Sequence, residues 1–412
     1  MGRWANKYVI GLTGNIATGK SVVRQMLQHL GAYTIDADGL SHQAMQPGAP
    51  AYKPVIEKFG AFIVGPDKQI NRQALGQVVF ANPQALDQLE AIVHPVVRQA
   101  TDVLVKRAKQ PVVVIEAIKL LEGDLADWVD TVWVVDASPK TQLTRLTGKR
   151  KMAPDEANQR MKVQNPQSEK LARADVVIKN DGSVEDTWKQ VQAGWEEVKK
   201  GTIAKLRPGA APATSAGTTP TAAKQAATAA AQRAEAANAP AAAAPTGDIV
   251  VRRGMPNNAE AIASFITKHG GKEVSRIDVM MSFGEKSYLI AEAGDTVVGL
   301  LGWQVENLIT RSDEFYVDGA VAKGTVIQQL TAEVESASED LQSEVAFIFL
   351  PGSTPADTVR TFQQNGYELT GIRDIKIPAW REAVQETVSG AEDSGLQILM
   401  KKLREDRVLK PI

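Results

Sequence analysis

Apolar runs alternate with amphipathic stretches over the first half of the chain. The β-branched run "YVIGLTG" precedes "SVVRQMLQHL", where apolar residues recur at helical spacing. The later runs "PVVVIEA" and "DTVWVVDA" are almost continuously apolar, which is typical of strands covered by helices on both faces. Shorter strands are predicted at "AYTIDAD" and "ADVVIKND". The alternation predicts an α/β fold with a doubly wound parallel sheet, whose ligands bind at the carboxyl ends of the strands.

Residues 202–247 interrupt this pattern. Ala, Pro, Thr and Gly dominate the segment, and large apolar residues nearly vanish after Leu206. Such a composition cannot bury enough apolar surface to offset the entropy lost on ordering. We therefore expect a flexible linker at 202–247 that joins a domain at 1–201 to a second domain at 248–412.

The pattern of the second domain mixes both periodicities. A strand "DIVVRRG", a helix "NNAEAIASFITKHG" and a hairpin "KSYLIAEAGDTVVGLLGWQVE" turning at "AGD" come first. The expected elements that follow are a strand "RSDEFYVDGAV", a helix "TVIQQLTAEVESASED", a strand "SEVAFIFLP", a helix "TPADTVRTFQQNG" and a strand "YELTGIRDIKI". This order predicts an α+β domain with a largely antiparallel sheet.

Composition removes several classes of function. The 412 residues carry a net charge of −1, so global electrostatics gives no reason to expect nucleic acid or an anionic membrane as a partner. The chain has no cysteine, which excludes disulfides, thiolate metal sites and cysteine nucleophiles. Four histidines without an HExxH-like pair lead us to expect no zinc site. We find neither a secretory signal nor a run of about 18 apolar residues, and expect a cytoplasmic protein.

The stretch "GNIATGKS" matches the phosphate-loop pattern G-x-x-x-x-G-K-[ST] and joins a predicted strand to a predicted helix. Backbone amides from Ala17 to Val22 and the helix dipole are expected to hold the β-phosphate. Lys20 would reach the β- and γ-oxygens, and Ser21 would ligate Mg²⁺. The alternative is a fortuitous glycine turn. The residues expected to contact ATP are Gly14, Ala17, Thr18, Gly19, Lys20, Ser21 and Val22.

Two acids follow the second predicted strand, in "TIDADGL". Asp36 and Asp38 are two residues apart, so on a continuing strand their side chains would face the same way. A phosphoryl acceptor hydroxyl needs a carboxylate nearby to orient it and to take its proton. The alternative is that the pair forms a turn capping the helix "GLSHQAM", since Asp is a favoured N-cap residue.

Taken with these residues, the first domain resembles dephospho-CoA kinase, a P-loop kinase fold with a helical lid. The resemblance covers about residues 7–200 and includes "IDAD", "LGQVVF", "LEAIVHP", "VWVVDAS" and "ARADVVIKNDGS". It implies transfer of the γ-phosphate of ATP to the ribose 3′-hydroxyl of dephospho-CoA, the last step of coenzyme A synthesis. It also implies that Asp38 is the catalytic base and that Asp36 assists at the acceptor or at Mg²⁺.

The resemblance implies further site residues. "TRLTGKRKMAPDEANQR" stands in the position of the family's mobile lid, and Arg150 corresponds best to the arginine that neutralises the transferring phosphoryl group. Lys151 departs from the Asp or Asn that usually follows. The basic cluster there also includes Arg145 and Lys149, and its alternative interpretation is a solvated helix end.

Four more residues complete the prediction. His94, ahead of Pro95, is expected to shape the acceptor pocket. Lys119 replaces an apolar residue in "IKLLE" and is either a substrate phosphate contact or simply exposed. Glu116, at the end of a strand, is a candidate to hold a Mg²⁺-bound water. Asn180 falls in the family's adenine-proximal loop, which makes it a candidate for contacting the ATP base.

The second domain resembles a GNAT-type acetyltransferase. "IVVRRGMPNNAEAIASFI", "YLIAEAGDTVVGLLGW" and "FQQNGYEL" carry the resemblance. The run at residues 321–326 keeps only the glycine of the family's pyrophosphate turn, and Phe362 stands where a tyrosine often protonates the leaving thiolate. We expect a non-catalytic module that binds CoA or has a regulatory role, with an acyl-CoA or a protein as its partner. Two alternatives stay open: a bifunctional kinase and acetyltransferase, and a nucleotide-binding switch without a small-molecule acceptor.

Overall fold

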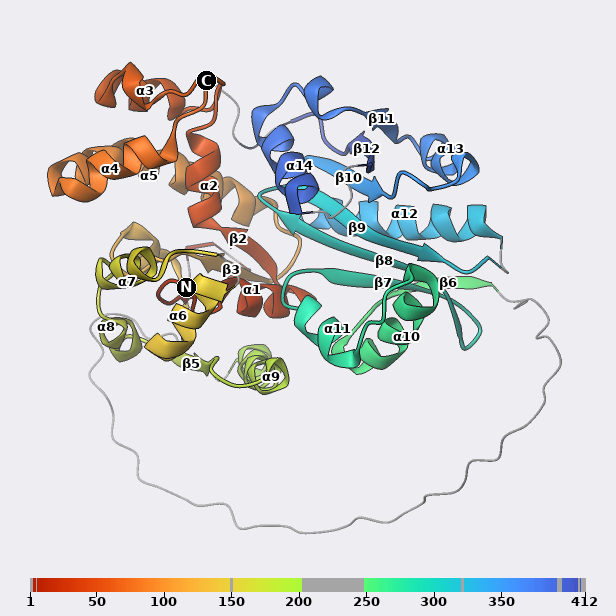
Figure 1. Ribbon diagram of the computed structural model, residues 1–412. Coiled ribbons are helices and arrows are strands. Elements are labelled where there is room, and N and C mark those ends of the chain that lie inside the picture. The colour runs from red at the N-terminus through yellow and green to blue at the C-terminus, as the bar shows by residue number, and fades with distance from the viewer. Residues whose placement is uncertain are drawn as a thin grey trace, which may run out of the picture.

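The computed structural model contains two sheets, one before and one after the predicted linker (Figure 1). It describes residues 3–4, 6–148, 151–201, 248–319, 322–390, 395–406 and 408. The predicted linker at 202–247 lies outside these residues. We keep the names N-terminal and C-terminal domain for the parts on either side of it, and their boundaries remain predictions.

The N-terminal sheet is parallel throughout and has the strand order β2-β3-β1-β4-β5. Its strands are β1 (Tyr8–Thr13), β2 (Tyr33–Asp36), β3 (Val112–Glu116), β4 (Thr131–Asp136) and β5 (Val176–Lys179). One face packs against α1 (Lys20–His29) and α9 (Val184–Lys200). The other face is covered mainly by α5 (Pro83–Arg107) and by α2 (Ala37–Ala44), α3 (Tyr52–Phe59) and α4 (Arg72–Ala81). Helices on both faces confirm the predicted doubly wound fold.

Three helices follow β4 on the way to β5. They are α6 (Pro139–Gly148), α7 (Pro154–Lys162) and α8 (Gln167–Ala172). This helical excursion stands where the sequence predicts a lid.

The C-terminal sheet has the order β11-β12-β10-β9-β8-β7-β6. All neighbouring strands are antiparallel except β9 and β10, so the predicted α+β character is confirmed. The strands are β6 (Ile249–Arg253), β7 (Ser287–Ala293), β8 (Thr296–Glu306), β9 (Ile309–Val317), β10 (Val345–Leu350), β11 (Glu368–Thr370) and β12 (Gln397–Lys402). The main helices are α10 (Ala259–Gly270), α12 (Lys323–Asp340) and α13 (Ala356–Gln364).

Two helices and one strand of this domain were not predicted. Helix α11 (Arg276–Ser282) has only 7 residues, too few to establish a period, although Ser275 and Asp278 form a capping box at its start. The predicted last strand "YELTGIRDIKI" is wrong beyond Thr370. The chain turns there into α14 (Pro378–Gly390), and strand β12 takes the place beside β10.

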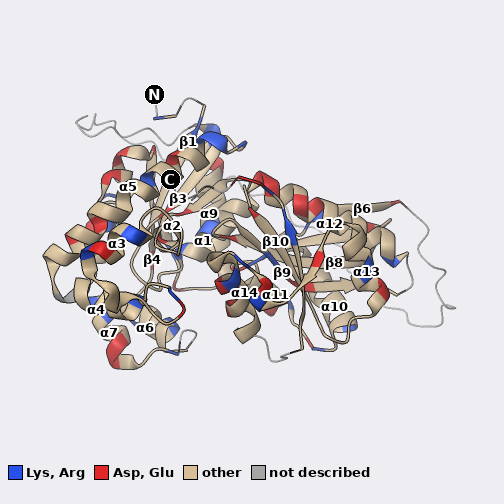
Figure 2. Cartoon of the chain, turned by 90° about the horizontal axis from the view of Figure 1, so that it is seen from above, with Lys and Arg blue, Asp and Glu red and all other residues tan. Residues whose placement is uncertain are grey.

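The two domains contact each other along α1, α5 and the β8–β9 hairpin. Gln25 donates to the Ser287 hydroxyl at 3.2 Å, and Gln342 donates to the Leu104 carbonyl at 2.8 Å. An ion pair joins Lys109 to Asp340 at 2.7 Å. Side chains of both charge signs occur on both domains (Figure 2), and none of the helices in the described residues has the length and apolar content needed to cross a membrane.

His29, at the end of α1, is a titratable group in this interface. Its Nε2 lies 3.2 Å from the Phe283 carbonyl, and its ring packs edge-on against Phe283 and Trp188. Burial lowers the pKa of His29 to about 4. A lowered pKa means that protonation is easier in the unfolded chain, so stability is full above about pH 6.5 and falls as the pH drops toward 4.

We expect the free energy of unfolding to fall by about 1–2 kcal/mol between pH 7 and pH 5 because of His29. The His29→Gln variant keeps a hydrogen-bond donor but does not titrate, so its pH dependence should be shallower. Urea unfolding of both proteins at the two pH values measures the difference. Equal losses in the two proteins would show that another group is responsible.

Candidate active site

The phosphate loop lies between β1 and α1, as predicted. Gly19 is the N-cap residue of α1 and has a left-handed φ of 98°. A Cβ at this position would lie 2.0 Å from the Asn180 side-chain nitrogen, so only glycine fits. Ala17 also adopts a positive φ, 59°, which is rare outside glycine and is found where the surroundings fix the backbone. The loop is thus held in one shape before any phosphate arrives.

Lys20 and Ser21 open helix α1 beside the end of β3. Lys20 is buried, and its Nζ lies 3.4 Å from the Asn15 carbonyl inside the loop. The Ser21 hydroxyl lies 3.3 Å from Oε1 of Glu116, whose other oxygen accepts from Arg24 Nε at 2.6 Å. The structure therefore brings together the two residues predicted at the metal, and it adds Arg24, which the sequence did not indicate.

The fit to Mg²⁺ rests on these oxygens. A hydroxyl and a carboxylate are ligands that Mg²⁺ accepts, usually together with phosphate oxygens and water. Over the residues that the structure describes, no group of three or more His, Asp or Glu side chains could hold a metal on its own. Ser21 and Glu116 fit a metal that arrives with a nucleotide.

The two predicted acids divide between two elements. Asp36 ends β2 in register with Glu116, and it caps α2 by accepting from the Gly39 amide at 2.8 Å. Asp38 lies inside the first turn of α2 and accepts from the Ile118 amide at 3.0 Å. The expectation of a continuing strand is wrong here, because the Asp36 cap starts a helix directly.

The charge state of Asp38 is tuned by this position. Burial, and then the nearby charge of Asp36, raises the pKa of Asp38 to about 6, while Lys20 acts in the opposite direction. A carboxylate with such a pKa is mostly ionised at neutral pH and is a stronger base than an ordinary aspartate. It is the acid of the pair that is suited to accept a proton.

Asn180 and Arg145 hold the phosphate loop from the lid side. The Asn180 amide donates to the Thr18 carbonyl at 2.8 Å and accepts from Thr187 at 2.9 Å, so both of its ends are engaged. Arg145 donates to the carbonyls of Ala17 at 3.1 Å and Asn180 at 2.7 Å. Asn180 lies next to the loop, as a nucleotide-proximal residue must, but its side chain supports the loop instead of facing a base.

Two glutamines that sequence reasoning missed cover the first loop amides. Gln164 accepts from the Ile16 amide at 2.7 Å, and Gln167 accepts from the Asn15 amide at 3.0 Å. Gln164 lies between α7 and α8, and Gln167 is the first residue of α8. Uncharged side chains in "VQNPQSE" carry no periodic or charge signal, so only the three-dimensional arrangement reveals them.

The predicted acceptor-side residues lie together on α5 and the loop after β3. Lys119 pairs with Glu90 at 2.6 Å, and His94 follows Glu90 by one helical turn on an exposed face. Pro95 is inside α5, not at a helix start. Arg150 and Lys149 lie outside the described residues, whereas Lys151 is exposed.

Removing the Asn180 amide should weaken nucleotide binding. In Asn180→Ala the Thr18 carbonyl loses the donor from Asn180 and keeps only that from Arg145, at 3.1 Å, so the loop can relax. We expect ATP affinity to fall about tenfold, which corresponds to one or two lost hydrogen bonds. Calorimetric titration with ATP measures this. Asn158→Ala on the exposed face of α7 is the matched control and should bind as the wild type does; equal affinity of all three proteins would contradict the supporting role of Asn180.

Comparison with known proteins identifies relatives of the N-terminal part of the chain. The family model for dephospho-CoA kinase matches residues 8–186. A dephospho-CoA kinase of Geobacter metallireducens is 46% identical over 192 residues, which cover 46% of this chain and 96% of the relative. Another from Symbiobacterium thermophilum is 40% identical over 228 residues, 52% of this chain and 95% of the relative.

Two solved structures each resemble part of this chain. A dephospho-CoA kinase from Campylobacter jejuni has 28% identity and a TM-score of 0.36, covering 48% of this chain and 99% of that one. The ribosomal-protein-S18-alanine N-acetyltransferase from Escherichia coli has 12% identity and a TM-score of 0.31, covering 39% and 97%. Scores at this level carry no argument by themselves. The two sequence relatives show the family. Through its N-terminal domain, the chain belongs to the dephospho-CoA kinase family, whose members are phosphotransferases.

Proposed function

We propose that the N-terminal domain transfers the γ-phosphate of ATP to the ribose 3′-hydroxyl of dephospho-CoA, with Asp38 as the base. The observation that carries this proposal is the position of Asp38, partly buried near Lys20 and anchored to the Ile118 amide at 3.0 Å. A nucleotide switch without an acceptor has no use for a carboxylate of raised pKa at this point.

The reaction needs few groups from the protein. The loop amides and Lys20 would hold the β- and γ-phosphates, and Asp38 would orient the 3′-hydroxyl and take its proton as the oxygen bonds to phosphorus. The leaving group is ADP. Arg150 remains the predicted lid cation that would balance the charge of the moving phosphoryl group.

Mg²⁺ is part of the proposal. Ser21 and Glu116 would hold it, and it would neutralise negative charge on the phosphates. Arg24 holds one oxygen of Glu116 at 2.6 Å and so fixes the direction of the carboxylate. Glu116 would then act through a metal-bound water with its other oxygen.

The acceptor side is proposed to lie between Asp36 and α5. Asp36 keeps Asp38 in place by capping α2 and adds negative charge beside it. His94 and the Lys119–Glu90 pair lie along the flank where the rest of dephospho-CoA would extend. In this proposal Lys119 exchanges Glu90 for a substrate phosphate.

Asp38→Asn tests the base. We expect kcat to fall by about 10²–10⁴-fold, because the amide cannot accept the proton. The same variant should be as stable as the wild type at pH 7 or more stable by about 1 kcal/mol, since the charged form of Asp38 is disfavoured by burial. Coupled ADP release with dephospho-CoA, and urea unfolding, measure the two effects.

The pH profile and a matched variant complete that test. Because the pKa of Asp38 is raised to about 6, kcat/KM should rise about tenfold per pH unit below pH 6 and level off above pH 7. Asp87→Asn on the exposed face of α5 should match the wild type. ATP or GTP hydrolysis that does not respond to dephospho-CoA would instead favour the switch.

We also propose that the C-terminal domain is a CoA-binding or regulatory module without acetyltransferase activity. Phe362 is fully buried, and its ring packs edge-on against Phe315 with centroids 5.1 Å apart. An aromatic ring without a hydroxyl supplies no proton to a thiolate. The pyrophosphate turn predicted at 321–326 falls partly outside the described residues, and α12 begins at Lys323.

A thiol assay on the full chain tests this second proposal. Since the protein has no cysteine, a thiol reagent reports only CoA released from acetyl-CoA. We expect no release above the protein-free rate with a set of primary amines as acceptors, including a polyamine and a peptide with a free N-terminus. Amine-dependent release would support the bifunctional alternative.

A further inference from the structure

The tip of the β8–β9 hairpin is in an unusual conformation. Asn307 and Leu308 connect the strands and have φ values of 52° and 65°, while Glu306 and Ile309 on either side are paired. Two left-handed residues form the tight turn that suits antiparallel hairpins, and Asn is common there. Leu is not, because its Cβ crowds the backbone at a cost of roughly 1–2 kcal/mol. Something outside the hairpin must hold Leu308 in place.

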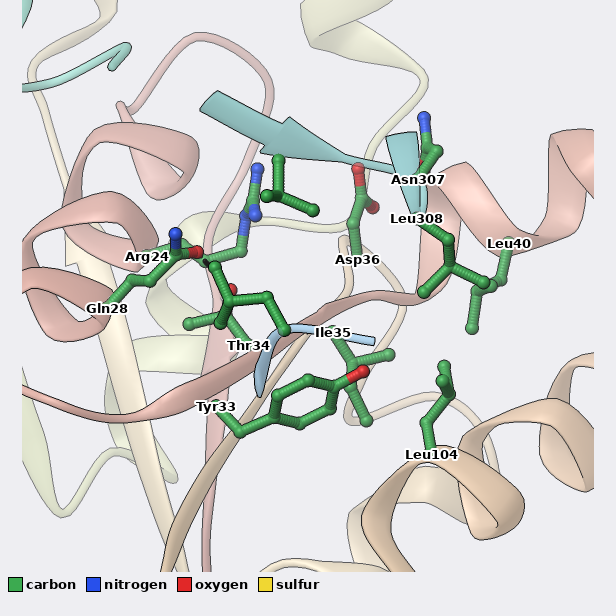
Figure 3. A pocket seen from close by; sticks show the side chains of 12 residues that line it. Arg24, Gln28, Tyr33, Thr34, Ile35, Asp36, Leu40, Leu104, Asn307 and Leu308 are labelled. Atoms are coloured by element: carbon green, nitrogen blue, oxygen red, sulfur yellow. Dashed lines mark hydrogen bonds between the residues drawn. The ribbon is translucent and has the colours of Figure 1, made fainter. Parts of the chain in front are cut away.

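That support comes from the N-terminal domain. Leu308 is 7% exposed and lies beside Leu40 of α2 and Leu104 of α5 around a cavity of about 30 Å³, large enough for a single water molecule (Figure 3). Burying a leucine contributes about 2 kcal/mol, which offsets the backbone cost. The turn conformation and the domain contact therefore stabilise each other.

Asn307 contacts the helix that carries Asp38. Its backbone carbonyl accepts a hydrogen bond from the Gln43 side chain of α2. A Cβ on Gly39 would lie 2.0 Å from Asn307 Oδ1 and 2.9 Å from Asp36 Oδ2, so both side chains close on the same glycine. Gly39 and Gln43 are one turn apart and face the hairpin together.

The opposite side of the first turn of α2 is held by the end of β3, where the Ile118 amide binds Asp38. The first turn of α2 therefore contacts the loop after β3 and the β8–β9 hairpin of the other domain. Charged groups of both domains also interact here. Burial alone would lower the pKa of Arg24, but the neighbouring carboxylates of Glu116, Asp36 and Glu306 raise it. Glu306, next to the tip, thus contributes to the field around Arg24 and Glu116.

We propose that Asn307 is a positioning residue for phosphoryl transfer: the hairpin of the C-terminal domain clamps the first turn of α2 and so fixes the direction of Asp38. The inference rests on the proposed function of Asp38. It gives the C-terminal domain a stated role, that of a structural part of the acceptor side of the kinase.

The size of the effect follows from the relatives. The Geobacter relative is matched over 96% of its length by 46% of this chain, which leaves no room in it for a second domain. Phosphoryl transfer in the family therefore does not require this hairpin. We expect the clamp to change the rate by about 3–10-fold, as a shift of about 1 kcal/mol in the positioning of a base would.

Asn307→Gly in the full chain is the decisive variant. Glycine keeps the left-handed turn and removes only the side chain. We expect kcat with dephospho-CoA to fall 3–10-fold while the KM for ATP stays unchanged, and backbone amides 39–43 to exchange hydrogen faster. Asp295→Gly, in the exposed turn at the other end of β8, is the control and should change none of these quantities.

A second pair of variants separates positioning from loss of structure. Asn307→Asp also keeps the turn but sets a carboxylate beside Asp36, so kcat should fall further and partly recover at 0.5 M salt, where charges are screened. Gln43→Ala removes the donor to the Asn307 backbone carbonyl, a bond that Asn307→Gly keeps, and should likewise make amides 39–43 exchange faster. Neither effect follows from a merely destabilised domain.

The outcomes are distinguishable. A wild-type chain that does not phosphorylate dephospho-CoA overturns the proposed function. Hydrogen exchange of amides 39–43 in Asn307→Gly and Gln43→Ala then still shows whether the hairpin holds α2. An active wild type with unchanged kcat and unchanged exchange in Asn307→Gly overturns the clamp alone. Faster exchange with unchanged kcat shows contact without positioning and also rejects the inference.

Discussion

The ion pair between Arg24 and Glu116 is the interaction on which the site depends. It joins α1 to the end of β3 at 2.6 Å, with both side chains less than a tenth exposed. A buried pair of this kind contributes little net stability, but an unpaired charge there would be very costly. Its effect is therefore to hold α1 in one position relative to the end of β3. The phosphate loop, which leads into α1, cannot move away from that strand end without separating the two charges.

Arg24 also compensates the negative charge of the acids that lie together at the carboxyl ends of the strands. Asp36, Glu116 and Glu306 all lie near the guanidinium of Arg24, and Asp38 has Lys20 near it. Asp38 has a raised pKa, whereas Asp36 caps α2 and Glu116 pairs with Arg24.

Sequence reasoning succeeded where a local rule decides the structure. The loop "GNIATGKS" and the five parallel strands follow from spacing and apolar runs. It failed where distant segments meet. Gln164 and Gln167 lie some 150 residues from the amides they cover, and Asn307 lies more than 260 residues from Gly39. At Asp36 the alternative interpretation, a cap for the helix that follows, is the one that the structure shows, and the expected continuation of the strand to Asp38 is wrong.

Gly39 shows how the two domains depend on each other within a single chain. Apart from Asp36, the atoms that a Cβ there would meet belong to Asn307 of the other domain. Because the Oδ1 atom of Asn307 lies 2.0 Å from the place of that Cβ, an alanine at position 39 would force the hairpin tip away from α2. A dephospho-CoA kinase without the second domain has no such hairpin to displace, so the second domain adds a constraint on the sequence of the first.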